Sequence, residues 1–365
     1  MPNRSMRERQ AVCERYLIHN KSGYLNARNI LQTLADTMPA DVYPDQYGEN
    51  EYVTQFEDSI AGLLGKESAV FMPSGTMTQQ LMLRIIADRQ GNRKVAYHPT
   101  CHLELHEQKA YQHLHDLQAI LIGRADLLLK PSDVFTIKEP FASLLLELPQ
   151  REIGGQLPPW EELQEISQWT HEHGVHLHMD GARFWQCGPF YGRSLAEIAA
   201  LFDTVYVSFY KILGGIAGAA LCGPRELMEE ARLWRHRQGG KLFGFYPLVA
   251  SAQIGLKQHL PLIPAYVEKA RSIAARLETI PGIRVTPNPP HINMMHLYLD
   301  GENEALMNAY ERIIDEDKVY MFNGLQPTRI PGMQKVELTI GDAALEISDD
   351  EIQGLFEKLM RYSKG

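Results

Sequence analysis

The sequence has few of the features that mark secreted or membrane-spanning proteins. Its 365 residues include only four cysteines, which are widely spaced and form no CxxC pair. Together with the absence of a signal-peptide pattern, this predicts a reducing, cytoplasmic location. No apolar run approaches the roughly 20 residues that a membrane-spanning helix needs. We therefore expect neither a disulfide scaffold nor a membrane anchor.

A basic excess is also missing. The chain has 36 lysines and arginines against 45 aspartates and glutamates, which gives a formal net charge of −9. This balance argues against nucleic acid or an anionic membrane as a partner, because both favour basic patches. It does not argue against a small anionic ligand in a local site. The length and the ordinary globular composition allow a large core and two domains.

The apolar pattern predicts an α/β chain in three parts. Residues 1–45 are polar and are expected to form an arm with short helices. Alternating strands and helices over 46–250 predict a large domain with a mainly parallel sheet, and 251–365 a smaller α+β domain. Strands are expected at SAVFM (68–72), LQAILIG (117–123), FASLLLELP (141–149), VHLHMDG (175–181) and TVYVSF (204–209), with those at 117–123 and 141–149 buried.

Two charged residues stand at the ends of predicted strands. Asp180 ends the run VHLHMD and is followed by Arg183, and Lys211 follows the run TVYVSFY and precedes three glycines within seven residues. Open α/β sheets bind ligands beyond the carboxyl ends of their strands. A carboxylate and an amine at that place suit pyridoxal 5′-phosphate, whose ring nitrogen needs an acid and whose aldehyde needs a lysine. An ordinary buried salt bridge would explain the same two charges.

A third element lies upstream, where the strand SAVFM leads through PSGTM into a predicted helix. The backbone N–H groups at a helix N-terminus, with the hydroxyls of Ser74 and Thr76 around a permissive Gly75, form a ready anion site. A phosphate group would fit there. The same triplet is also common as a simple turn and helix cap.

The histidines allow a different hypothesis, in which they bind a metal ion. His102 and His106 are four residues apart and share a face if the segment is helical, and His176, His178 and Asp180 share one face of a predicted strand. Either set could belong to a metal-dependent hydrolase. Neither shows a recognised zinc spacing, and this alternative leaves the Ser-Gly-Thr turn and the Lys211 glycine cluster unexplained.

Four motifs in order carry a resemblance: YGENEYVTQFEDSIAGLLGKESAVFMPSGTM, CHLELHE, HMDGARFW and SFYKILGGIAG. Over roughly residues 45–250 the chain resembles the threonine aldolase and β-eliminating lyase family. The resemblance implies an aspartate-aminotransferase-like fold, which is pyridoxal-phosphate fold type I. It also implies a homodimer or homotetramer that acts on a small amino acid.

The resemblance also implies roles for single residues. Lys211 would form a Schiff base with the cofactor aldehyde, Asp180 would pair with the pyridine nitrogen, and His102 would stack on the ring. Arg183 would lie near the cofactor and the substrate carboxylate. The implied cofactor-binding set is Ser74, Gly75, Thr76, His102, Asp180, Arg183, Ser208 and Lys211.

The reaction implied is cleavage of a β-hydroxy-α-amino acid, such as threonine or allo-threonine, to glycine and an aldehyde. A base must take the proton from the β-hydroxyl, a contribution typically worth ~10²–10⁴-fold in rate. His102 is the first candidate for this base and His106 the second. A solvated or packed His106 is an equally good explanation of the pattern.

Departures from the family pattern leave the substrate open. Gln150 stands where the family shows a histidine, GGKLFG replaces a GGGMRQ-like stretch, and Glu337 stands where an arginine would hold the substrate carboxylate. Arg329 is a candidate substitute, although a surface arginine is the simpler explanation. A pyridoxal-phosphate-dependent β-eliminating lyase acting on another β-substituted amino acid, and a non-catalytic relative, are therefore kept as alternatives.

Overall fold

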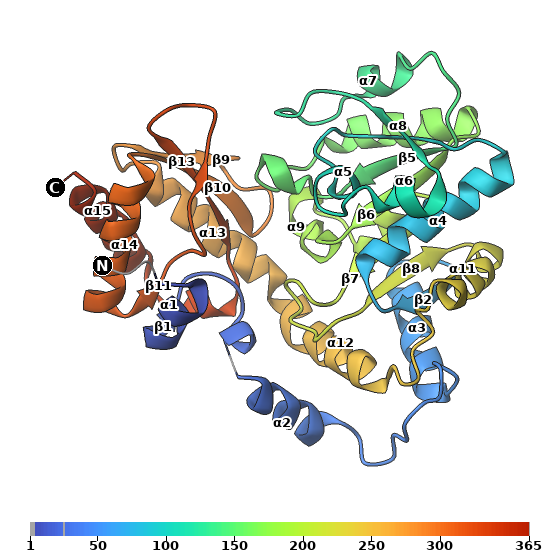
Figure 1. Ribbon diagram of the computed structural model, residues 1–365, viewed down its shortest axis with the longest axis horizontal. Helices are drawn as coiled ribbons and strands as arrows, with labels where there is room; N and C mark the ends of the chain where they lie inside the picture. Colours follow the sequence, from blue (N-terminus) through green and yellow to red (C-terminus); the bar gives the residue numbers. More distant parts are fainter. Residues whose placement is uncertain (1–3, 25, 365) are drawn as a thin grey trace. The chain divides into compact units, whose positions relative to one another are not determined.

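The structure is a computed structural model that describes residues 4–24 and 26–364, in two compact units (Figure 1). The large unit comprises Leu31–Glu152 and Leu157–Leu260. The small unit comprises Ile153–Gln156, Pro261–Gly365 and the segment up to Ile30. The N-terminal segment thus packs with the C-terminal part of the chain, while the boundaries expected at residues 45 and 250 stay predictions.

A mixed sheet forms the centre of the large unit. Within the described residues it has seven strands in the order β2-β8-β7-β6-β5-β3-β4, and β8 alone runs antiparallel to its neighbours. The predicted mainly parallel sheet is therefore confirmed. The strands are β2 (Ser68–Met72), β3 (Lys94–Tyr97), β4 (Gln118–Leu121), β5 (Ser143–Glu147), β6 (His176–Gly181), β7 (Thr204–Ser208) and β8 (Ala219–Gly223).

Helices cover both faces of this sheet, as alternation along β2 shows. Val70 and Met72 pack into a core cluster with α4 (Gly75–Gln90) and α11 (Arg225–Arg237). Phe71, on the opposite face, meets Phe56 of α3 (Glu51–Leu63) with ring centroids 5.9 Å apart. Strands buried on both faces read as continuous apolar runs, which is the pattern of the sequence.

The other helical segments of the large unit are shorter or lie at its borders. They are α2 (Ala27–Thr37), α5 (His102–Leu105), α6 (Ala110–His115), α7 (Pro131–Phe135), α8 (Trp160–Glu172), α9 (Gly188–Tyr191), α10 (Leu195–Ala199) and α12 (Tyr246–His259), with the 3₁₀ turns η2 (Arg151–Ile153), η3 (Phe184–Gln186) and η4 (Leu260–Leu262).

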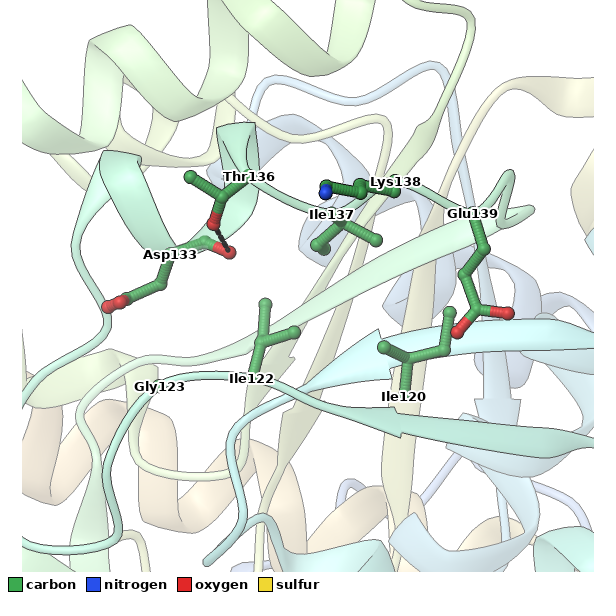
Figure 2. A pocket seen from close by; sticks show the side chains of 8 residues that line it. All are labelled: Ile120, Ile122, Gly123, Asp133, Thr136, Ile137, Lys138 and Glu139. Atoms are coloured by element: carbon green, nitrogen blue, oxygen red, sulfur yellow. Dashed lines mark hydrogen bonds between the residues drawn. The ribbon is translucent and has the colours of Figure 1, made fainter.

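One burial prediction is wrong. FASLLLELP contributes the inner strand β5, but β4, within LQAILIG, is an edge strand that pairs only with β3 and exposes Leu121. A hollow of about 410 Å³ lies beside this edge, and Figure 2 shows the side chains that line it. It contains none of the predicted site residues, because its lining is Ile120, Ile122, Gly123, Asp133, Thr136, Ile137, Lys138 and Glu139.

The small unit is built on an antiparallel sheet in the order β12-β13-β10-β9, and β1 pairs with β11 in parallel beside it. A buried ion pair, Arg9 Nε to Glu311 Oε1 at 2.5 Å, ties α1 to α14. The elements are α1 (Met6–Val12), β1 (Arg15–Tyr16), η1 (Lys21–Tyr24), α13 (Ile263–Leu277), β9 (Ile283–Thr286), β10 (Met294–Asp300), α14 (Asn303–Asp317), β11 (Val319–Tyr320), β12 (Gln326–Pro327), β13 (Met333–Thr339), η5 (Asp342–Glu346) and α15 (Asp349–Tyr362).

Strand register brings several chemically active residues to one edge of the large sheet. Asp180 pairs with Glu147 on one side and with Tyr206 on the other. Ser208 and Met72 each pair with Ala219, so the end of β7 and the end of β2 are level. The carboxyl ends of β2, β5, β6 and β7 therefore form one rim, the place where open α/β sheets bind ligands.

The loop that carries Lys211 is held against helix α12 by a close backbone approach. Gly215 N–H donates to the Phe209 carbonyl at 2.8 Å, which folds the loop back on itself. A Cβ at Gly255 would lie only 2.1 Å from the Leu213 carbonyl oxygen. Only glycine allows this contact, so Gly255 fixes where the loop sits.

Substituting Gly255 by alanine should force the loop and helix apart. We expect Gly255→Ala to lower the free energy of unfolding by about 1–3 kcal/mol, the usual range for overpacking. Gly62→Ala is the control, because nothing lies within 4 Å of a Cβ there and alanine favours a helix by up to about 1 kcal/mol. Urea unfolding of both variants tests this, and equal stabilities would contradict it.

Candidate active site

Asp180 is a carboxylate buried at the end of β6, with an exposed fraction of 1%. A buried charge is costly unless it is hydrogen-bonded. Gln79 of α4 donates from Nε2 to Oδ2 at 2.8 Å, and the Ala182 N–H donates to Oδ1 at 3.1 Å. Each oxygen accepts one bond and keeps a lone pair for a ligand.

Helix α4 begins at the same rim. Ser74 is its N-cap and accepts the Met77 N–H at 3.3 Å, while Thr76 is exposed. A Cβ on Gly75 would lie 1.9 Å from the Tyr206 hydroxyl, so only glycine permits the helix to start against this ring. Since Tyr206 pairs with Asp180, the N-terminus of a 16-residue helix is placed beside the carboxylate. The predicted anion site and the predicted acid are thus neighbours.

Lys211 lies in the loop after β7 and is half-buried. Burial lowers the pKa of its amine to about 8, with help from the Arg183 guanidinium, while the Asp180 and Glu147 carboxylates act in the opposite direction. Loss of hydration disfavours the charged amine. The neutral, nucleophilic form is therefore available near physiological pH, and four titratable side chains influence the protonation of Lys211 and of one another at the rim.

Glu147 completes this group and was not predicted. Burial raises the pKa of its carboxyl to about 8, and Asp180 raises it in the same sense, while Lys211 and Arg183 oppose the shift. Its oxygens accept from Gln150 Nε2 at 3.1 Å and from the Arg151 N–H at 3.3 Å. It ends the run SLLLE as Asp180 ends VHLHMD, so the strand-end argument could have found it.

The histidines of the CHLELHE segment each pair with a carboxylate. His102 Nδ1 lies 2.9 Å from Glu107 Oε1, and His106 Nε2 lies 2.9 Å from Glu152 Oε1. The two rings are one helical turn apart, with centroids separated by 5.1 Å. Glu107 is buried and also accepts from Gln80 Nε2 at 2.7 Å. The sequence pattern contains no signal for these partners.

The geometry does not support the metal-site alternative. His176 Nε2 and His178 Nδ1 both bond the Thr204 hydroxyl, at 2.7 and 2.8 Å, and do not converge with Asp180. Burial lowers the pKa of His178 to about 3, which keeps the ring neutral. Among residues 4–24 and 26–364, no three His, Cys, Asp or Glu side chains could hold a metal ion.

The remaining predicted residues are placed as follows. Ser208 is buried at the end of β7, and its hydroxyl donates to the Ala182 carbonyl at 2.7 Å. Arg183 precedes η3 and is half-buried. Arg329 is exposed and belongs to the small unit, so its expected contact with a substrate stays a prediction. The ligand-binding roles of all these residues are predictions in the same sense.

Comparisons with known proteins agree on one class. Residues 30–300 match the model of the β-eliminating lyase family. A low-specificity L-threonine aldolase of Arabidopsis thaliana is 24% identical over 322 residues, which cover 85% of this chain and 88% of that protein. A solved structure from Listeria monocytogenes, assigned as an L-allo-threonine aldolase, is 40% identical with a TM-score of 0.93 and 98% coverage of both chains.

A second solved structure, from an Exiguobacterium species, is assigned as an aromatic amino acid β-eliminating lyase/threonine aldolase. It is 38% identical, with a TM-score of 0.92 and coverage of 98% of this chain and 99% of that chain. A Sphingomonas wittichii serine palmitoyltransferase, 18% identical with a TM-score of 0.69, covers 96% of this chain and 88% of its own and shares the fold.

The fold and the rim together define a pyridoxal-phosphate-dependent enzyme of fold type I. The family match and the two solved structures also identify the family within that class. The chain belongs to the threonine aldolase and β-eliminating lyase family, and it is a lyase. The fold predicted from the resemblance is confirmed.

The residues at the rim fit the cofactor of this family. Asp180 would supply the acid for a ring nitrogen, Lys211 would supply an amine of lowered pKa for an aldehyde, and the α4 N-terminus would supply N–H donors for a phosphate. The glycine at position 75 keeps the helix start tight against Tyr206. Gln79 Oε1 is a buried acceptor without a partner in the described residues, so the amide has spare hydrogen-bonding capacity beside Asp180.

Acid should destabilise the protein through His178. In the folded protein the pKa of His178 is about 3, below the ordinary value of 6.5. Below pH 6.5 the unfolded chain therefore binds more protons than the folded chain, and stability decreases as the pH decreases. At about pH 5 this amounts to about 2 kcal/mol, from ~1.4 kcal/mol per pKa unit. Between pH 7 and about pH 5, the free energy of unfolding measured with urea should therefore fall by about 2 kcal/mol less in His178→Leu than in the wild type. The exposed His171→Gln variant should lose as much as the wild type.

Cofactor uptake should follow the ionisation of Lys211. With a pKa of about 8, the amine becomes neutral as pH rises through 8, and only the neutral amine attacks an aldehyde. The rate at which apoprotein takes up pyridoxal 5′-phosphate should therefore rise with pH and level off above about 8. Stopped-flow absorbance measures it. A rate that keeps rising toward pH 10 would show an unperturbed lysine.

Proposed function

We propose that this lyase cleaves a threonine- or allo-threonine-like β-hydroxy-α-amino acid to glycine and an aldehyde. The observation that carries the proposal is that the loop with Lys211 follows β7, the strand next to β6, whose end holds the buried Asp180 carboxylate. The names given to the Listeria and Arabidopsis relatives, which refer to L-allo-threonine aldolase and low-specificity L-threonine aldolase, support this substrate class. Cleavage of the Cα–Cβ bond needs a group that accepts electrons from Cα, and this family's cofactor supplies it when bound.

The chain's own residues bind and orient the reactants. Lys211 would hold the cofactor aldehyde through its side-chain amine. Asp180, held by Gln79 and the Ala182 N–H, would keep a proton on the ring nitrogen because a buried carboxylate favours a cation next to it. The Ser74 cap and the α4 N-terminus would hold the phosphate, and Arg183 would lie near the substrate carboxylate.

A base must remove the β-hydroxyl proton, and His102 Nε2 is the atom we assign. The His102 ring is one-third exposed while its Nδ1 is engaged by a buried carboxylate, so Nε2 is the open nitrogen. His106 is the weaker candidate, because its Nε2 is already bonded to Glu152, which also accepts from Arg151. Gln150 cannot serve, since an amide has no basic nitrogen and its Nε2 donates to Thr100 and Glu147.

The substitution of Gln150 for a family histidine is the observation that favours a second candidate. Without that histidine, the substrate's β-substituent meets a neutral amide network instead of a titratable ring. A β-eliminating lyase that expels another β-substituent needs no base at a β-hydroxyl. The name of the Exiguobacterium relative covers both activities.

Location and assembly belong to the same proposal. The four cysteines are all buried and unpaired as thiols, which supports a reducing, cytoplasmic setting. Within the described residues no helix has the length and hydropathy to cross a membrane. We propose a homodimer or homotetramer on the family resemblance, with Arg329 as a candidate ligand of the substrate carboxylate. A native mass equal to that of one chain would contradict the oligomer.

Lys211 should be essential and other buried lysines should not. We expect the purified protein to be yellow, and Lys211→Ala to lose both the near-visible absorbance and all turnover. Lys66→Met is the matched control, since burial also lowers the pKa of Lys66, whose Nζ donates to the Phe202 carbonyl. The control should keep its colour. A colourless wild type, or a yellow Lys211→Ala, would contradict the assignment.

The product decides between the two lyase activities. Incubated with L-threonine, L-allo-threonine and phenylserine, the protein should release glycine and the matching aldehyde. Release of ammonia and a keto acid from a β-substituted amino acid, with no aldehyde from any of the three, would establish β-elimination. A yellow protein that turns over neither set would be a non-catalytic relative.

A further inference from the structure

Glu107 is a buried carboxylate close to the site that has no role in the proposal so far. Its side chain is 1% exposed, and it lies just after α5. Oε2 accepts from Gln80 Nε2 at 2.7 Å, and Oε1 lies 2.9 Å from His102 Nδ1. The described residues contain no salt bridge from Glu107 to lysine or arginine, so the His102 ring is the group that can supply a positive charge.

The physical consequence concerns the tautomer of His102. When an imidazole donates from Nδ1 to a carboxylate, the neutral ring carries no proton on Nε2, and Nε2 becomes an acceptor. When Nε2 then takes a proton, the ring becomes a cation beside Glu107, a carboxylate that has no other positively charged partner among the described residues. The burial of Glu107 strengthens this attraction because its carboxylate is shielded from water.

We infer that Glu107 is a positioning residue that holds His102 with Nδ1 protonated and stabilises the imidazolium formed when Nε2 accepts the substrate's β-hydroxyl proton. The inference rests on the proposed function, since it requires His102 to be the base. No atom is gained or lost in the step: one proton moves from the substrate oxygen to Nε2, and the positive charge that results lies against Glu107. Glu107 itself need not touch the substrate.

Gln80 makes the arrangement rigid. It follows Gln79 on α4, and the two consecutive amides donate to different carboxylates, Gln79 to Asp180 and Gln80 to Glu107. Both glutamines are 1% exposed, so their side chains are fixed by packing. One helix therefore orients the acid expected at the ring nitrogen and the carboxylate behind the base.

The chain offers a matched control in the second histidine pair. His106 and Glu152 are also 2.9 Å apart, but His106 is exposed and Glu152 shares its charge with Arg151. Removing Glu152 breaks the same type of contact without affecting His102. A loss specific to Glu107 would therefore come from its position and not from the loss of a histidine–carboxylate pair in general.

The experiment compares Glu107→Gln, Glu107→Leu and Glu152→Leu in the holoenzyme with threonine or allo-threonine. Glu107→Gln keeps the shape and an acceptor but removes the charge, and Glu107→Leu removes both. We expect kcat to fall at least about 10-fold in Glu107→Gln and further in Glu107→Leu, up to the ~10²–10⁴-fold worth of a general base. KM should stay within about 3-fold of the wild-type value, because the substrate contacts are intact. The cofactor absorbance should not change, because the cofactor contacts are intact. Glu152→Leu should keep its kcat.

A second readout does not depend on turnover. In apoprotein labelled with ¹⁵N-histidine, at a pH where the ring is neutral, the His102 Nε2 signal should be that of an unprotonated nitrogen in the wild type and should change in Glu107→Leu but not in Glu152→Leu. If Glu107→Leu does not fold, Gln80→Leu replaces it, with a smaller loss of kcat. Full kcat in the Glu107 variants, or equal losses in Glu107→Leu and Glu152→Leu, would overturn the inference alone. Full turnover in His102→Leu would overturn both it and the base assigned in the proposed function.

Discussion

The structure depends on the burial of one charge, the carboxylate of Asp180, at the end of an inner strand. Removing a carboxylate from water is costly, and the chain offsets this with a side-chain amide from Gln79 and a backbone N–H from Ala182. Each carboxylate oxygen of Asp180 accepts only one of these hydrogen bonds and keeps a lone pair. Among the described residues no cation is placed in contact with Asp180, and a protonated pyridine ring would fit there.

Helix α4 links this charge to the rest of the site. Its first residues form the predicted anion-binding end, its start is set by the contact of Gly75 with Tyr206, and its consecutive glutamines reach Asp180 and Glu107. The helix packs against both α11 and the sheet, in the same core cluster as β2, β7 and β8. Groups with separate chemical tasks are thus held by one rigid element, and their spacing is protected from local loop motion.

Much of this arrangement could be predicted from the sequence, for a physical reason. A charge directly after an apolar run marks a strand end, and strand ends in a parallel sheet meet at one edge, so Asp180 and the Lys211 loop could be placed together without coordinates. The order of the four motifs gave the fold and the family. The edge position of β4 could not be read in this way, because an apolar run is equally compatible with an inner strand and with an edge strand beside a hollow.

The contacts that support the site residues could not be predicted from the sequence, for a different reason. Gln79, Gln80 and Glu107 are polar residues that ordinary patterns assign to solvent, and only the packing of α4 against the sheet and α5 shows that they are buried. The segment up to Ile30 belongs to the small unit, through contacts such as the Arg9–Glu311 pair, whose partners are about 300 residues apart. Non-local pairs of this kind leave no periodic signal in the sequence.

The central claim is that Lys211 is the residue that holds the cofactor. Its most direct test is borohydride reduction of the purified protein, followed by proteolysis and mass spectrometry of the peptides. The account predicts a pyridoxyl group on the peptide that contains SFYKILGG, attached to Lys211. Labelling of another lysine, or of none, would contradict it.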